Sequence, residues 1–403
     1  MRKVSGVVGA LTVLAVMAVA APGALAQRIE MGEHTHVNLD FLLQVQAQAV
    51  EKGAPDGDAW STDFFLRRTR LLVSGAVWKD ITFFWEVDQP NFGKGGKWDT
   101  AFFTQDAFMS FKVDDAFIVD VGMIILPFTR PSMQGAVGLS ALDYHSGLIR
   151  FVEGSHKVWR DAGVQLRGYV ADQKFQYRLG VFNGAQGTAL QRDQAGRSVL
   201  TANPEDWPRV TGHVRYNILG KETDFFGKGI YFTAEPILSL GLGLDFQPDV
   251  VVERPTVLDV NQVVLEPGAL RAALGIAADL FLDLPVADEQ ELVFQGAFFW
   301  YDHGYAFEVD ALGQGTRVAH HNSGTGFLTE VGYRWRWLQP VFSADWFKSK
   351  QRGADLLALR GGVNFWIRKH AANIKAEFGA EKRGRMEDAP WTQALTVQAQ
   401  LFF

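Results

Sequence analysis

Long runs of alternating apolar and polar residues constrain this chain more than any other feature. In residues 35–49 the odd positions are mostly apolar, whereas the even positions carry His, Asn, Asp and Gln with a single Leu. A period of two is typical of a β-strand whose two faces meet different environments. The run is longer than the roughly 5–6 residues usual in soluble sheets and is long enough to cross a membrane. It therefore indicates a transmembrane strand.

The same alternation recurs in sixteen candidate strands. They occupy residues 35–49, 63–78, 81–89, 101–113, 117–126, 161–171, 175–183, 208–218, 229–246, 268–283, 290–302, 324–337, 339–349, 355–367, 372–382 and 392–403. Connections after even-numbered strands are mostly short, whereas those after odd-numbered strands are longer, as at 127–160, 184–207, 247–267 and 303–323. Short turns on one rim, long loops on the other and an even strand count are typical of outer-membrane barrels. The sequence predicts an all-β fold, a transmembrane antiparallel β-barrel.

Composition excludes several other classes. The chain has 39 Lys and Arg against 45 Asp and Glu, so it lacks the basic excess expected of a general nucleic-acid binder. Beyond residue 26 no apolar run reaches the length of a membrane-spanning helix. Without cysteine, the chain has neither a disulfide framework nor a thiolate metal site. Any membrane role must therefore use strands.

The amino terminus has the pattern of an export signal. Two basic residues precede an apolar stretch at 7–20, and an Ala-Leu-Ala sequence at 24–26 offers a cleavage site. We expect a signal peptide at 1–26 and a barrel domain at 27–403, located in the outer membrane of a Gram-negative bacterium. Loss of two cations would change the formal net charge from −6 to −8. An uncleaved anchor helix is the alternative.

Aromatic residues crowd the ends of several predicted strands. Residues 83–85 read Phe-Phe-Trp, residues 298–301 read Phe-Phe-Trp-Tyr, and the chain ends in Phe402 and Phe403. Aromatic girdles of this kind mark both membrane interfaces of outer-membrane barrels. Ordinary core aromatics are the alternative interpretation.

The connection at 127–160 is the longest stretch without sustained alternation. It is locally basic, with Arg130, Arg150, Lys157 and Arg160 against Asp143 and Glu153. Its aromatic and apolar residues argue against disorder, and connections of this length are usually functional. We expect this third outer loop to fold into the barrel and constrict it, the alternative being a solvated surface loop.

Several segments resemble one known family. They are the hairpin at 64–88, with its Arg-Arg-Thr-Arg motif, the strand at 121–131 ending in Leu-Pro-Phe-Thr-Arg-Pro, and segments 163–184, 359–378 and 398–403. Their order along the chain is similar to that of the phosphate-selective porins of the O/P type. These are trimeric, sixteen-stranded channels of Gram-negative outer membranes.

The resemblance implies passive diffusion of small hydrophilic solutes, in particular anions such as phosphate, along a ladder of arginines. By motif it assigns Arg67, Arg68 and Arg70 to that ladder, and by position Arg130 to the constriction. It also implies a homotrimer embedded in outer-membrane lipid, and recognition of the terminal Phe403 by the barrel-assembly machinery. The small residues at 268–278 are one stretch that could pack between subunits.

Lumen-facing positions supply the candidate pore-lining and anion-binding residues. These are Arg68, Arg70, Arg130, Arg150, Lys157, Arg160, Arg167, Arg209, Arg215, Arg334 and Arg336. Acidic residues are expected to share the lumen, namely Glu86, Asp88, Asp106, Asp120, Asp245, Asp279, Glu330 and Glu377. Selectivity is set by the few charges at the narrowest point, because distant charges are screened, so an anion preference is compatible with an acidic chain. A general or weakly cation-selective porin stays open as the alternative.

Other function classes have less support. No catalytic residues, cofactor or metal ligands are expected, because the adjacent His145 and Ser146 lack a third group and the pairs His34/His36 and His320/His321 are taken as surface residues. A structural or adhesive barrel with a closed lumen would need bulky inward residues. Several inward positions are instead glycine, at 75, 122, 180, 241, 243, 275 and 332. A soluble periplasmic β-protein would have shorter strands.

Overall fold

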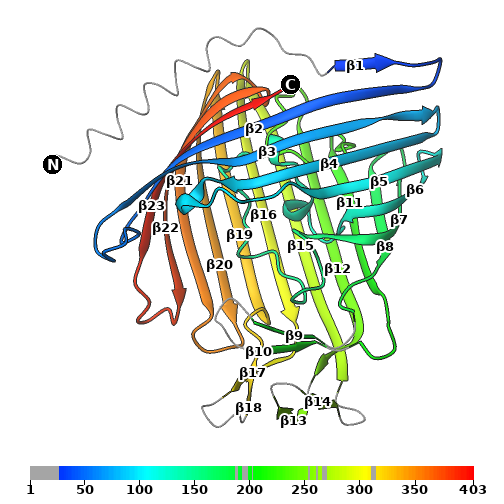
Figure 1. Cartoon of the computed structure of the whole chain (residues 1–403). Helices are drawn as coiled ribbons and strands as arrows, with labels where there is room; N and C mark the ends of the chain where they lie inside the picture. The colour runs from blue at the N-terminus through cyan, green and yellow to red at the C-terminus, as the bar shows by residue number, and fades with distance from the viewer. Residues whose placement is uncertain are drawn as a thin grey trace.

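A computed structural model describes residues 27–186, 189–192, 198–201, 203–252, 255–259, 262–265, 270–309 and 315–403. Sixteen long antiparallel strands form a closed barrel (Figure 1). They are β2 (His36–Val50), β3 (Ser61–Trp78), β4 (Ile81–Phe92), β5 (Phe103–Asp114), β6 (Phe117–Ile125), β7 (Arg160–Val170), β8 (Phe175–Phe182), β11 (Arg209–Leu219), β12 (Ile237–Val252), β15 (Leu270–Ala287), β16 (Gln290–Asp302), β19 (Gly324–Trp335), β20 (Leu338–Ser349), β21 (Asp355–Arg368), β22 (Ala372–Gly384) and β23 (Thr392–Phe402). The barrel closes where β2 pairs with β23. The predicted fold class is confirmed, whereas the predicted signal peptide lies outside the described residues.

Alternation along each strand places polar side chains inside the barrel and apolar ones outside. On β2, Gln44 and Gln46 are buried in the lumen, where they bond to Gln400 and Gln398 across the closing seam. On β12, Leu240, Leu242 and Leu244 project outward and are exposed. An apolar outer surface of this kind is what a membrane-spanning barrel presents to lipid.

The two rims of the barrel differ, as the connection lengths predict. Hairpins β9–β10 (Ala189–Arg192 and Ser198–Thr201), β13–β14 (Pro255–Asp259 and Gln262–Leu265) and β17–β18 (Tyr305–Val309 and Gly315–Ala319) extend from one end. Strand β1 (Gln27–Glu30), which pairs with the start of β2, and the carboxyl terminus lie at the other end (Figure 1). In outer-membrane barrels long loops are extracellular and short turns periplasmic. We therefore call the end with the three hairpins extracellular and the end with β1 and the carboxyl terminus periplasmic.

One predicted strand starts too early. We expected a strand from 229 to 246, but β12 begins at Ile237 and extends to Val252. Residues 220–236 instead form a long periplasmic connection that turns into the barrel and pairs with the third outer loop, loop 3 (residues 126–159). Gly229 donates its backbone N–H to Gly138 O at 2.7 Å, and Gly135 donates to Gly227 O at 3.1 Å. Residues 229–236 alternate only weakly, and their contact with loop 3 inside the lumen keeps them out of the barrel wall.

Loop 3 lies inside the barrel, where it carries the single-turn helices η2 (Arg130–Met133) and η3 (Ala136–Gly138). Its side chains Phe128, Leu148 and Phe151 form an apolar cluster with inward-facing Phe299 and Tyr301 of β16. Two of the aromatics assigned to a membrane girdle therefore fill the lumen instead. None of the helices in the described part of the chain is long and apolar enough to cross a membrane.

Lumen-facing glycines make room for loop 3, which corrects the expectation that they leave the lumen empty. A Cβ on Gly243 would lie 1.6 Å from the backbone oxygen of Phe128, and one on Gly275 would lie 3.3 Å from its ring. The small residues of β12 and β15 thus permit close approach of the loop backbone to the barrel wall. Loop 3 therefore fills the part of the lumen next to β12 and β15. The remaining open space lies on the other side of loop 3, next to β2, β3 and β4.

Candidate functional site

The free space of the lumen includes a cavity of about 760 Å³ between loop 3 and the wall formed by β2, β3, β4, β21, β22 and β23. Its lining includes Val50, Lys94 and Arg383 near the extracellular rim. We call it the outer cavity. Its cationic side chains are Arg67, Arg68, Arg70, Lys94, Lys157, Arg160, Arg360 and Arg383. Its acidic side chains are Asp88, Asp143, Glu377 and Glu381, so cations outnumber acids by eight to four in a chain of formal charge −6.

A β-bulge brings two successive arginines into the outer cavity. The register between β2 and β3 shifts between Gln44, which lies opposite Arg68, and Val45, which lies opposite Leu66. The extra residue, Arg67, interrupts the inward–outward alternation, so Arg67 and Arg68 both line the cavity. The arginine motif thus presents one more cation than a regular strand would.

Asp143 of loop 3 contacts both of these arginines. Its carboxylate lies 2.7 Å from Arg67 Nε and 2.6 Å from Arg68 Nη2. Burial opposes ionisation of this carboxyl, but the two guanidinium groups outweigh burial and hold its pKa well below its usual range. Loop 3 is therefore anchored to the arginine ladder by a permanently charged aspartate, which neutralises part of that ladder.

Arg70 and Arg160 lie between the outer cavity and a second one, because both residues line each cavity. Arg70 forms ion pairs with Glu86 at 2.8 Å and Asp88 at 3.0 Å, while Arg160 pairs with Asp106 at 3.0 Å. Paired side chains of this kind are fixed in position, so this passage has a defined shape. We call it the arginine passage.

The second cavity, of about 380 Å³, lies nearer the periplasmic rim, since it is lined by His370 and Phe402 next to the last turn and the carboxyl terminus. We call it the inner cavity. Its other lining comes from β2, β3 and β4, from loop 3 at residues 135–138 and from the periplasmic connection at 226–228. The two inward segments thus form one wall of a route that passes along β2, β3 and β4.

His145 anchors loop 3 on the opposite side. Its ring nitrogens lie 2.7 Å from Asp345 and 3.0 Å from Glu330, on β20 and β19. Burial lowers the affinity of the imidazole for its proton, but the two carboxylates outweigh it and raise the pKa of His145 to about 10. His145 is therefore a charged clamp at neutral pH. With both nitrogens engaged by carboxylates, it does not serve Ser146 as a base.

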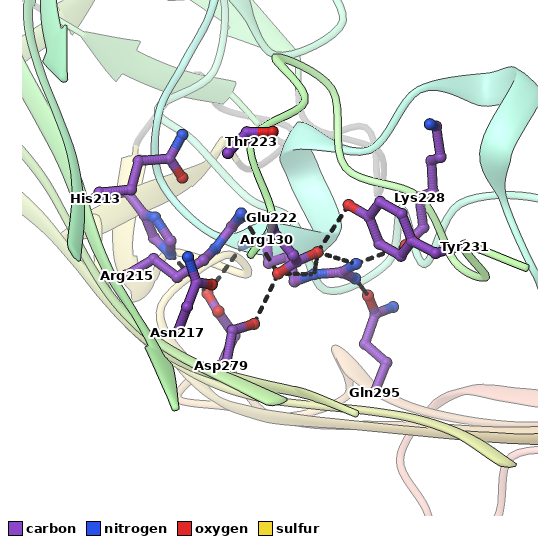
Figure 2. A network of polar contacts seen from close by, with 12 residues as sticks. Arg130, His213, Arg215, Asn217, Glu222, Thr223, Lys228, Tyr231, Asp279 and Gln295 are labelled. Carbon is purple, nitrogen blue, oxygen red and sulfur yellow. Dashed lines mark hydrogen bonds and ion pairs between the residues drawn. The ribbon is translucent and has the colours of Figure 1, made fainter. Parts of the chain in front are cut away.

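A buried network joins loop 3 to the periplasmic connection (Figure 2). Arg130 donates to Glu222 at 2.7 Å and also contacts Gln295, and both members of the ion pair are fully buried. Tyr231 donates its hydroxyl to Glu222 at 2.9 Å, and Arg215 lies 3.4 Å from it. Despite burial, Arg130 and Arg215 lower the pKa of Glu222 to about 2. Glu222 went unnoticed in the sequence because no strand pattern surrounds it.

The structure separates the predicted pore-lining residues into two groups. Arg68, Arg70, Lys157 and Arg160 line the outer cavity. The others lie away from both cavities. Five of them form ion pairs: Arg130 and Arg215 with Glu222, Arg167 with Asp120, Arg209 with Asp161 and Asp245, and Arg334 with Glu291. Arg150 instead donates to the backbone carbonyls of Gly147 and His321. Arg336 lies exposed in a periplasmic turn. Except for Arg336, each of these side chains bonds to a carboxylate or a backbone carbonyl.

Besides Arg67, which only the family motif assigned, three cations of the outer cavity were absent from the predicted pore-lining residues. Arg360 and Arg383 come from β21 and β22, and Lys94 from the loop after β4. The alternation of β21 did place Arg360 inward, but loop residues carry no such signal. Only the tertiary structure shows which side chains of the rim line the lumen.

One group of side chains has the composition of a metal site. Glu153, His320 and His321 offer ligand atoms within 4.8 Å of one another, and both histidines are buried. This corrects the expectation that the pair at 320–321 is a surface feature. Imidazole and carboxylate are ligands that Zn²⁺ accepts, so these residues could hold such an ion.

Comparison with known proteins supports the interpretation of the fold. Residues 37–206 match the family model described as phosphate-selective porin O and P. The resemblance seen in the sequence is confirmed. No relative among the curated proteins matches the chain. The matched residues include β3, which carries Arg67, Arg68 and Arg70, and loop 3.

Solved structures similar to this chain include outer-membrane channels and porins. OmpF of Salmonella typhi, in complex with daunomycin, has a TM-score of 0.59 at 11% identity, over 94% of this chain and 100% of its own. The outer-membrane channel DcaP of Acinetobacter baumannii has a TM-score of 0.58 at 12% identity, over 94% and 100%. An anion-selective porin from Comamonas acidovorans has a TM-score of 0.53 at 13% identity, over 92% and 100%. These similarities show that the chain has the fold of a porin.

Proposed function

We propose that this protein is a passive diffusion channel for small hydrophilic solutes with a preference for anions, phosphate or similar. The observation that carries the proposal is the local excess of cations in the outer cavity, eight against four acids, in a chain of opposite net charge. Because salt screens charges beyond about 8–10 Å, the cavity lining outweighs distant rim charges in selecting ions. Diffusion requires no chemical step.

The proposed route runs from the outer loops through the outer cavity, past Arg70 and Arg160, and through the inner cavity to the periplasm. Arginine suits such a route since its guanidinium stays charged and offers paired donors to oxyanions. Lys94 and Lys157 lie at the mouth, where no ion pair to either is found among the described residues. They are therefore the cations best able to attract a passing anion.

Assembly follows the family resemblance. The channel is proposed to work as a homotrimer in outer-membrane lipid, exported by the predicted signal peptide and inserted through recognition of its terminal Phe403. Supporting the last point, Phe403 pairs through its backbone with Phe41 at the periplasmic rim and is 41% exposed. An anion-selective porin from Comamonas acidovorans shares the fold, which is consistent with the proposed preference.

The test is the reversal potential of the purified mature protein in a planar bilayer under a KCl gradient. Wild type should give the sign of an anion-selective channel, and Lys94→Glu/Lys157→Glu should weaken or invert it. The matched control is Lys52→Glu/Lys97→Glu, which changes charge equally on exposed outer-loop residues that do not line the cavity. Equal effects of the two double variants would contradict the proposed route.

A weakly cation-selective porin is the second candidate. Glu86 and Asp88 flank Arg70 in the arginine passage, and Asp106 pairs with Arg160, so acids outnumber arginines there. If these five charges dominate, the wild-type potential will have the cation-selective sign. A closed structural barrel would instead give no discrete conductance steps at all.

A further inference from the structure

The wall of the proposed route changes from largely charged to largely apolar at the arginine passage. On the extracellular side the outer cavity is lined by eight cations and four acids, with amides and apolar side chains among them. On the periplasmic side, Leu42, Leu72 and Ala136 form a buried apolar cluster, with Phe84, Val137 and Phe402 packed against it. All six of these residues line the inner cavity. A solute therefore leaves a basic surface and meets an apolar one.

The charged groups of the inner cavity already have partners. Arg70 pairs with Glu86 at 2.8 Å, and Lys228 of the periplasmic connection pairs with Asp224 at 2.7 Å. His370 contacts the Ile230 carbonyl through Nε2 at 2.9 Å, and burial lowers its pKa to about 4, so it is neutral at pH 7. Beyond Arg70 and Arg160, the inner cavity thus adds little net charge to attract an inorganic anion.

A small, strongly hydrated ion gains nothing from such a wall, since apolar constrictions in channels act as barriers to hydrated ions. A solute with an apolar body gains from removal of that body from water. The anionic group of the solute would still find donors next to the apolar wall, at the arginine passage. Arg70 is almost completely buried, and its Nε has no hydrogen-bond partner among the described residues.

From this juxtaposition we infer that the favoured solute is an organic monocarboxylate with an apolar body, such as an aromatic acid. Its carboxylate is held at Arg70 and Arg160 while its ring lies against Leu42, Leu72 and Phe84. The inner cavity, of about 380 Å³, is more than twice the volume of the roughly 150 Å³ apolar cavity that accommodates benzene in an engineered protein core. The assignment rests on the proposed anion channel, and within it replaces inorganic phosphate by an organic anion as the favoured solute.

The experiment compares benzoate, acetate and inorganic phosphate as blockers of chloride current through single channels of the full mature protein. Acetate carries the same carboxylate as benzoate without the ring. Benzoate should halve the chloride current at a concentration at least about fivefold lower than acetate does, because only benzoate buries an apolar body. Phosphate should be no better a blocker than acetate.

Two variants of one residue locate the effect. Leu72→Gln places a polar group of similar length in the inner cavity and should abolish the preference for benzoate, whereas Leu72→Met keeps the wall apolar and should retain it. Neither variant changes the charges of the route, and the reversal potential in KCl is recorded for both beside the block by benzoate. If Leu72→Gln does not fold, Val137→Thr makes the same test from loop 3 with an isosteric change.

The outcomes separate the solute class from the channel itself. An anion-selective channel that benzoate and acetate block equally, or that phosphate blocks best, would overturn the solute class and leave the channel function intact. A preference for benzoate that survives both Leu72→Gln and Val137→Thr would also overturn it, because the inner cavity would not be the site. A cation-selective reversal potential would overturn both proposals.

Discussion

Arg130 of loop 3 and Glu222 of the periplasmic connection form an ion pair at 2.7 Å, 92 residues apart in the chain, with both side chains completely buried. Gln295 of β16 and Tyr231 complete their hydrogen bonds (Figure 2). The pair joins the segment that enters the barrel from outside to the one that enters from the periplasm. Arg130, assigned by position to solute, thus has a structural role.

Glu222→Leu should destabilise the folded barrel by about 3–5 kcal/mol, because it leaves a buried arginine without its carboxylate. The double variant Arg130→Met/Glu222→Leu should recover part of that loss, since it removes the uncompensated charge. Urea unfolding followed by tryptophan fluorescence in detergent measures both. A double variant no more stable than Glu222→Leu would show that the two side chains are not coupled.

His145 should make the position of loop 3 sensitive to alkaline pH. Its pKa in the folded protein, about 10, exceeds the ordinary value near 6.5 because Asp345 and Glu330 stabilise the imidazolium. Its stabilising contribution is therefore complete below pH about 6.5 and is lost as pH rises through about 10. Conductance noise in wild type should increase across pH 9–11, a window set about the pKa near 10. His145→Gln, which does not titrate, should be noisier already at pH 7 and lack that step.

Asp143→Asn should increase anion preference, because the substitution leaves Arg67 and Arg68 without the carboxylate that neutralises them. The permeability ratio of chloride to potassium should rise by about two- to threefold, as expected when a charge lining a pore is removed. Asp172→Asn, at an exposed periplasmic turn, carries the same change in net charge and is the control. An equal rise in both variants would mean that net charge, not the cavity lining, sets selectivity.

Gly243→Ala should displace loop 3 from β12. The added Cβ would lie 1.6 Å from the Phe128 carbonyl oxygen, a backbone atom that cannot rotate away. We expect a loss of about 1–3 kcal/mol in stability and an altered single-channel conductance. Gly361→Ala is the matched control, because a Cβ there meets nothing within 4 Å. A Gly243→Ala channel with wild-type conductance would contradict the close contact.

Some ion pairs of the lumen could be anticipated from hairpin register alone. Arg70 lies opposite Asp88 on the neighbouring strand, and Arg334 lies opposite Glu291. Both pairs form, at 3.0 Å and 2.7 Å. A short turn joins β3 to β4, so local geometry brings Arg70 and Asp88 together, whereas β16 and β19 are joined by a long connection and the pair of Arg334 with Glu291 depends on the closed sheet.

The sequence by itself determined the barrel, its strands and the two faces of each strand, because the alternation that encodes them is local and repeats with every second residue. It could not determine the start of β12 at Ile237, nor that Arg130 would meet Glu222 rather than solute. Those features depend on loop 3 and residues 220–236 meeting inside the lumen. Contacts between segments so far apart in the chain leave no periodic signal, so only the tertiary structure decided which cations face the open route and which hold the wall together.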